Sequence, residues 1–279
     1  MPLARTADLV AAAYRSGTGI VAFNVITLEH AEAIAAGAQE AGRPVILQIS
    51  ENAVKFHGGR LMPIAAASVA VAADSSTPVS VHLDHVEDPA LLYATADAGV
   101  SSVMFDASKL DYRDNVAATK AAVDWAHAKG LYVEAELGEV GGKDGAHAPG
   151  VRTDPGAAAE FVAATGVDAL AVAVGSSHAM STRTAALDFD LIAHLRAAVP
   201  VPLVLHGSSG VPDSDLRKAV SAGITKINVG TLLNVAFTAE VRTYLAADPM
   251  VTDPRRYLAP ARAAVARAVA DTIAGLSGP

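Results

Sequence analysis

Short apolar runs recur along the chain, and most of them follow a glycine that ends a helix-like stretch. The run Ser102–Phe105 follows Gly99, and the run Lys226–Val229 follows Gly223. A glycine just past a helix accepts the left-handed conformation that lets the chain turn. Apolar runs of this length, bounded by turn signals, are typical of strands buried in a parallel sheet. The pattern therefore predicts repeated helix-to-strand units.

Helix starts agree with these units, because Asp88-Pro89 and Asp154-Pro155 each place a capping acid before a proline. The predicted strands end near Asn24, Ser50, Asp84, Asp106, Glu136, Val174, His206 and Val229. Eight strands alternating with helices in 279 residues predict an α/β protein, a single (β/α)8 TIM barrel over residues 1–279. Extra helices are expected at the N-terminus and at the C-terminus. The alternative, an open doubly wound sheet, lacks its glycine-rich fingerprint after the first strand.

One segment falls outside the repeat. Residues Leu137 to Arg152 contain five glycines between the fifth strand and its helix. A loop of this length inside a compact domain is usually functional, so we expect a lid.

Composition narrows the classes of partner. Apolar residues make up 52% of the chain, enough for a large core, and the net charge is −8 without a basic stripe. Nucleic acid and anionic membranes are therefore poor partners, and a small-molecule substrate is expected. The chain has no cysteine, which excludes disulfides and suits a cytoplasmic location. The N-terminal residues lack the apolar run of a signal peptide.

Polar side chains gather at the predicted strand ends, which meet at one mouth in a barrel. His85, His178 and His206 lie at three of these ends, and three imidazoles with an open position are typical of a catalytic zinc site. Asp84 is placed either for proton transfer or for orienting an imidazole. Glu136 is either a further metal ligand or an orienting acid. His82 is expected to be a buried partner of this cluster.

Two loops suit a phosphate group. Residues 206–210 follow the seventh strand, and residues 228–231 precede a helix that starts after Thr231. Small residues, hydroxyls and a helix N-terminus bind phosphate at this position of the fold. A lysine Schiff base is the alternative to a metal, but the sixth strand carries no lysine. Lys226, near the start of the eighth strand, is expected to lie far from the mouth.

The chain resembles the class II, metal-dependent fructose-bisphosphate and tagatose-bisphosphate aldolases, and looks closest to the tagatose-type branch. The matching segments run in order along nearly the whole chain: Ala22–Asn24, Pro44–Ser50, Val81–His85, Ser102–Asp106, Val133–Gly138 with Gly141–Gly142, Thr165–Val172, Pro202–Gly207 and Lys226–Val229. The His-Leu-Asp-His and Glu-x-Glu-Leu-Gly segments are specific in combination.

The resemblance implies roles for individual residues. His85, His178 and His206 match the Zn²⁺ ligands, Glu136 and Asp106 match acids near the metal, and Asp84 matches the acid that exchanges a proton with the aldehyde oxygen. The residues that match the substrate pocket are Asn24, Ser50, Ala179, Gly207, Ser208, Ser209, Asn228, Val229, Gly230 and Thr231. A monovalent cation beside the phosphate and a homodimer or homotetramer are further implications.

Three positions depart from the family pattern. Ala179 replaces a glycine, and Asp144 stands where the lid has a glutamate that acts as base. Ala259 replaces an arginine that reaches the second phosphate, which leaves Arg256 or Arg262 as substitutes. The expected reaction is cleavage of a ketose phosphate to dihydroxyacetone phosphate and an aldehyde. A non-catalytic sugar-phosphate-binding protein and an epimerase stay open as alternatives.

Overall fold

The computed structural model is a closed barrel of eight parallel strands, described for residues 3–137, 152–177 and 182–276. Each strand pairs with the next along the chain, and β8 closes the barrel on β1. The strands are β1 Ile20–Asn24, β2 Val45–Ser50, β3 Val79–Val86, β4 Ser102–Phe105, β5 Tyr132–Glu136, β6 Ala169–Ala171, β7 Leu203–Leu205 and β8 Ile224–Val229. The TIM-barrel prediction is confirmed, and the open doubly wound sheet is wrong.

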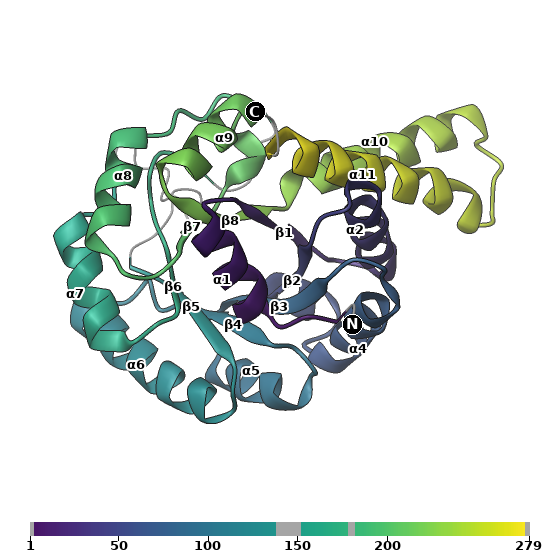
Figure 1. Ribbon diagram of the computed structural model, residues 1–279. Helices are drawn as coiled ribbons and strands as arrows, with labels where there is room; N and C mark the ends of the chain where they lie inside the picture. The colour runs from purple at the N-terminus through teal and green to yellow at the C-terminus, as the bar shows by residue number, and fades with distance from the viewer. Residues whose placement is uncertain (1–2, 138–151, 178–181, 277–279) are drawn as a thin grey trace.

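Helices surround the barrel (Figure 1). They are α1 Thr6–Ser16, α2 Leu28–Ala41, α3 Glu51–Phe56, α4 Leu61–Asp74, α5 Pro89–Ala94, α6 Tyr112–Ala128, α7 Pro155–Thr165, α8 Phe189–Ala198, α9 Asp213–Ala222, α10 Thr231–Ala247 and α11 Arg255–Leu276, with 3₁₀ turns η1 Thr95–Asp97 and η2 Ser208–Gly210. The side chains of Asp88 and Asp154 cap α5 and α7, as predicted. No helix in the described ranges combines the length and apolar character needed to cross a bilayer.

The inside of the barrel changes from apolar to polar along its axis. Helix α1 lies across the N-terminal end (Figure 1), where Val10 and Ala13 pack on Ile20 and Ile46. A second apolar layer consists of Met104, Ala169, Ala171 and Val204. The N-terminal part also holds a small buried hydroxyl cluster of Thr6, Ser80 and Ser102, whereas the ionisable side chains inside the barrel lie toward the C-terminal mouth.

Strand β3 contains an irregularity beside that mouth. Its pairing with β4 shifts between Leu83 and Val86, so that β3 has one residue more than its partner over this stretch. His85 lies within the shift and has a φ of 50°. Among the described residues other than glycine, it alone has a positive φ. Neighbouring residues of a regular strand point to opposite faces. A β-bulge re-aims a side chain, and here it allows Asp84 and His85 both to face the mouth.

Helices α10 and α11 form an antiparallel pair that extends away from the barrel (Figure 1). The second half of α11 packs closely on α2, and Gly37 of α2 lies at this contact. A Cβ atom added at Gly37 would lie 2.4 Å from the carbonyl oxygen of Ala266 and 2.7 Å from Cβ of Val269. Glycine therefore sets the distance between these two helices.

Replacing Gly37 by alanine is expected to destabilise the protein, although alanine is the better helix former by about 1 kcal/mol. The added methyl group meets backbone, which cannot rotate away, so the expected loss is about 1–3 kcal/mol in the free energy of unfolding. Urea denaturation measures it. The control is Ala36→Gly at an exposed position of α2, for which about 0.5–1 kcal/mol is expected from backbone entropy alone. A Gly37→Ala protein at least as stable as the wild type would contradict the close packing.

Candidate active site

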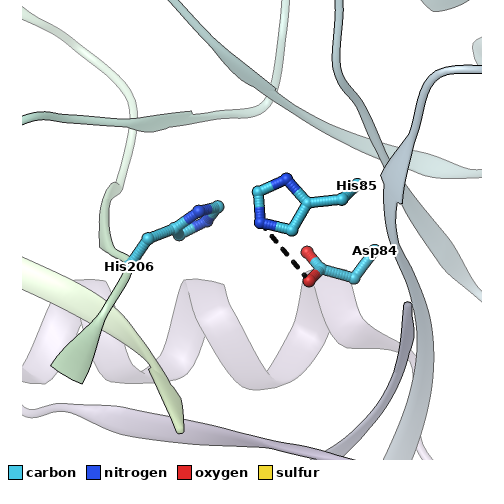
Figure 2. Close-up of side chains that lie close together, drawn as sticks. All are labelled: Asp84, His85 and His206. Carbon is cyan, nitrogen blue, oxygen red and sulfur yellow. Dashed lines mark ion pairs between the residues drawn. The ribbon is translucent and has the colours of Figure 1, made fainter. Parts of the chain in front are cut away.

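Three side chains from β3 and the end of β7 meet at the C-terminal mouth of the barrel. Asp84, His85 and His206 each offer one ligand atom, and these atoms all lie within 4.8 Å of one another. Figure 2 shows the two imidazole rings facing each other with Asp84 beside His85. The ring centroids are 4.8 Å apart and the rings are nearly perpendicular. Two of the three histidines predicted to bind metal are thus adjacent, and His178 lies outside the described residues.

The ring of His85 is oriented by Asp106. Its Nδ1 donates to Oδ2 of Asp106 over 2.8 Å, while Oδ1 of Asp106 accepts from the backbone amide and hydroxyl of Ser108. A carboxylate only accepts hydrogen bonds, so the proton of the imidazole is on Nδ1. The Nε2 atom of His85 is therefore the nitrogen that can bind a metal ion. With both oxygens of Asp106 engaged, the geometry favours an orienting role for this predicted metal ligand.

The ring of His206 is oriented in the same way by Glu134. Nε2 of His206 lies 3.0 Å from Oε1 of Glu134, and both side chains are fully buried. Burial would raise the pKa of Glu134, but the Lys226 ammonium and the hydrogen bond from His206 lower it to about 2. Burial lowers the pKa of His206 itself. A neutral ring facing a carboxylate carries its proton on Nε2, which leaves Nδ1 for a metal ion.

Asp84 lies beside both imidazoles and is almost fully buried. Its Oδ2 accepts from Nε2 of Gln48 over 3.1 Å, and its Oδ1 has no hydrogen-bond partner among the described residues. Burial acts to raise the pKa of Asp84, but the electrostatic influence of the neighbouring His85 and His82 imidazoles outweighs it and holds the pKa well below its usual range. Asp84 is therefore ionised and offers an oxygen that can take a proton.

His82 is fully buried, and its Nδ1 lies 2.8 Å from the hydroxyl of Ser102. Its Nε2 lies 3.8 Å from Asp84. This agrees with the predicted role as a buried partner. Glu136 lies close to His85 and Asp106, within the same 4.8 Å limit, and 3.7 Å from Nδ1 of His206. It stays a candidate metal ligand.

A cavity of about 300 Å³ opens beside this cluster. The predicted substrate residues that line it are Asn24, Ser50, Gly207, Ser209, Asn228, Gly230 and Thr231, together with Asp84 and His85. Ser208 and Val229 do not line it, because Ser208 is buried with its hydroxyl on Leu205 and Val229 packs in the core. Ala179, Asp144 and nearly all of the predicted lid lie outside the described residues.

The two loops predicted to bind phosphate both line this cavity. Ser209 accepts from the backbone amide of Leu232, which ties the β7 loop to the first turn of α10. Gly207 has φ 68°, and a Cβ atom there would lie 2.4 Å from the carbonyl oxygen of Ser177. The helix begins at Thr231, so its first backbone amides face the cavity with partial positive charge. The arrangement suits an anionic group.

Two arginines considered for the second phosphate lie elsewhere. Arg256 pairs with Asp248 over 3.8 Å, and Arg262 pairs with Glu32 on α2. Neither lines the cavity. Both belong to α11, whose first turns pack away from the mouth on α10 and α2, so the hypothesis that they replace the family arginine is not supported within one chain.

The prediction that Lys226 lies far from the mouth is wrong. The residue is the third of β8, but its long side chain runs up the inside of the barrel and its ammonium lies 2.8 Å from Asn228 Oδ1. Gln48, to which no role was assigned, lies beside it with its amide bonded to Asn24 and Asp84. The signal for both was available, because each is a long polar residue within a mainly apolar strand.

Comparison with known proteins gives consistent results. The family model described as "Fructose-bisphosphate aldolase class-II" matches residues 4–278. A fructose-bisphosphate aldolase of Geobacillus stearothermophilus is 40% identical over 268 residues, which covers 95% of this chain and 93% of the relative.

Solved structures agree. The crystal structure of the YdjI aldolase from Escherichia coli K12 superposes with a TM-score of 0.84 at 33% identity, covering 98% of this chain and 97% of that one. The fructose-bisphosphate aldolase structure from Campylobacter jejuni, at 23% identity and a TM-score of 0.82, shares the fold over 97% of this chain and 93% of its own. From the family match over almost the whole length and the 40% identity, the chain belongs to the class II fructose-bisphosphate aldolase family, a family of lyases.

Proposed function

We propose that this aldolase uses Zn²⁺ to cleave a ketose phosphate reversibly, giving dihydroxyacetone phosphate and an aldehyde. Fructose 1,6-bisphosphate and tagatose 1,6-bisphosphate are the candidate substrates. The observation that carries the proposal is a pair of imidazoles, each held by a carboxylate on one nitrogen, beside an ionised aspartate in a cavity that ends at a helix N-terminus.

The donor set fits zinc. His85 and His206 each present one nitrogen, and these nitrogens lie close enough together to bind the same ion. The carboxylates that hold the two rings are typical partners of zinc-binding histidines. With His178, these residues would make a three-histidine site with an open position. A zinc ion bound there would act as a Lewis acid that stabilises the negative charge developing on the ketone oxygen during cleavage.

The protein side chains supply the remaining chemistry. In the cleavage direction the bond between C3 and C4 breaks, its electron pair moves toward the carbonyl carbon, and the C4 hydroxyl becomes the aldehyde. That hydroxyl must lose its proton, and the proposed acceptor is the carboxylate of Asp84, which lines the cavity. Asp144 stays a prediction for the base that exchanges a proton at C3.

The phosphate of the dihydroxyacetone half is held by the loops after β7 and β8. Gly207, Gly230 and Thr231 leave room for the group, and the backbone amides at the start of α10 donate to it. Lys55 of α3 also lines the cavity as a cation, paired with Glu51 over 2.7 Å. Its place at the rim suits the outer, aldehyde end of a sugar phosphate.

The protein is further proposed to be a cytoplasmic homo-oligomer. The pair α10 and α11 extends from the barrel and carries apolar side chains that are exposed in a single chain: Val235 on α10 is 48% exposed, and Met250 at the turn is 84% exposed. Light scattering coupled to size-exclusion chromatography tests this. A strictly monomeric species at micromolar concentration would contradict it.

The substrate is tested with the purified protein, zinc and a panel of fructose 1,6-bisphosphate, tagatose 1,6-bisphosphate and fructose 1-phosphate. Dihydroxyacetone phosphate is measured through NADH oxidation by a coupled dehydrogenase, and products are identified by NMR. We expect turnover of at least one bisphosphate. Tight binding of the panel without cleavage would establish the non-catalytic alternative, and a product epimeric with its substrate would establish the epimerase.

A further inference from the structure

The ammonium of Lys226 is fully buried inside the barrel. It donates to three acceptors: Oε1 of Gln48 over 3.1 Å, Oε2 of Glu134 over 2.8 Å and Oδ1 of Asn228 over 2.8 Å. An ammonium has three protons and no lone pair. All three protons are used, so Lys226 is not arranged as a nucleophile.

The hydrogen bond to Lys226 fixes the orientation of each acceptor, and Glu134 and Gln48 in turn contact side chains at the mouth. Glu134 accepts from His206 with its other oxygen. Gln48 accepts from the ammonium with its oxygen, and its amide nitrogen therefore points the other way, toward Asp84 Oδ2 and Asn24 Oδ1. Asn228 likewise accepts with its oxygen, so its Nδ2 is turned away from Lys226.

The other end of the Asn228 amide, its Nδ2 atom, lacks a partner among the described residues. Nδ2 is buried, and Asn228 lines the cavity. A buried donor without an acceptor is costly, which is why such groups usually have a ligand or an ordered water as partner. The oxygen-rich substrate of an aldolase is a suitable acceptor.

We propose that Lys226 is a positioning residue for the whole site: its ammonium fixes which end of the Gln48 and Asn228 amides faces the substrate, and it holds the Glu134 carboxylate that orients the metal ligand His206. The inference rests on the proposed function: its metal arm on the proposed zinc site, and its substrate arm on the proposed ketose phosphate. Without the ammonium either amide can rotate by 180°, and a rotated Gln48 would turn an oxygen toward the Asp84 carboxylate.

The test is a double-mutant cycle of Lys226→Met, Glu134→Gln and both together. Methionine keeps much of the side-chain volume and removes the charge. In the double variant both charges are absent, which avoids the uncompensated buried carboxylate that makes single removal destabilising. The exposed Lys120→Met serves as the matched lysine control. Circular dichroism and thermal unfolding of the metal-free proteins establish which variants fold.

Zinc affinity is measured by competition with a chromophoric chelator, without substrate. Lys226→Met is expected to weaken zinc binding by about 10- to 100-fold, the usual effect of losing support for a ligand. In the Glu134→Gln background, Lys226→Met is expected to cause no further loss of zinc affinity, because the carboxylate through which Lys226 acts on His206 is already absent. A merely structural lysine would lower the unfolding temperature in both backgrounds and leave the zinc affinity of the folded protein unchanged.

The substrate arm is measured at saturating zinc. Relative to Glu134→Gln, the double variant is expected to raise KM by about tenfold, the order of one hydrogen bond, and to lower kcat through the misplaced Gln48. If Lys226→Met does not fold, this comparison replaces it. Unchanged zinc affinity, KM and kcat on removal of Lys226 would overturn the proposal. A wild type that cleaves no ketose phosphate but loses zinc affinity in Lys226→Met would reject the proposed function and support the positioning role.

Discussion

Replacing Asp84 by asparagine is expected to lower kcat by about 10²- to 10⁴-fold, the range for losing a group that transfers a proton in the transition state. Asparagine has nearly the same shape, so Gln48 and His82 stay packed around it. Its amide, however, cannot accept a proton at neutral pH. Initial rates of dihydroxyacetone phosphate formation measure the effect.

The control for losing a carboxylate is Asp124→Asn on the outside of α6, where the side chain is 63% exposed. It is expected to leave the rate unchanged. Zinc affinity, determined separately, is expected to stay within about tenfold in Asp84→Asn, because Asp106 and Glu134 still hold the imidazoles. An Asp84→Asn enzyme with near wild-type kcat would assign the proton transfer to another group.

Removing the metal is expected to abolish cleavage, since no other described group beside the ketone carries the positive charge needed to stabilise the developing carbanion. Dialysis against a strong chelator should reduce activity to background, and stoichiometric zinc should restore it. His85→Ala is expected to do the same without a chelator, because it removes one proposed ligand of the metal together with its hydrogen bond to Asp106.

The matched control is His194→Ala, an exposed histidine of α8, which is expected to keep both zinc and activity. Measuring zinc content by emission spectrometry alongside the rate separates loss of metal from loss of fold. Full turnover in a protein shown to contain no divalent metal would reject the Lewis-acid mechanism outright.

Much of the fold could be predicted because the signals are local. Glycines after helices, prolines after capping acids and short apolar runs each report on a few neighbouring residues. Their repetition determined the class, since a parallel strand must be followed by a crossover. The predicted strand ends are also close to those observed, although β6 and β7 end at Ala171 and Leu205, before the predicted Val174 and His206.

The prediction of the site was less complete. Its members could be named because strand ends converge in a barrel, but their orientations depend on contacts between strands distant in sequence. Lys226 and Glu134 are 92 residues apart, and nothing near either one indicates the pairing. The backbone of Lys226 lies near the start of β8, but its long side chain extends along the barrel axis toward the mouth. Likewise, the pattern of residues gave no indication of the shift in β3.

Lys55 is expected to recognise the phosphate at the aldehyde end of a bisphosphate substrate. Ala179 and Asp144 lie outside the described residues, and Arg256 and Arg262 pair elsewhere. Lys55 is the lysine among the described residues that line the cavity. A Lys55→Met variant that loses affinity for a bisphosphate but keeps it for fructose 1-phosphate would show that this lysine reads the second phosphate. Equal losses for both substrates would remove it from that role.

The extra residue in β3 also has an evolutionary consequence. Deleting one codon between Leu83 and Val86 would restore a regular ladder with β4 and leave the apolar faces of both strands packed. Asp84 and His85 are the two residues of this stretch, so the deletion would remove one of them and leave a barrel without either that carboxylate or that imidazole. A single in-frame deletion would therefore keep the fold but abolish the activity. Lineages that keep the reaction must conserve the length of this strand as strictly as its side chains.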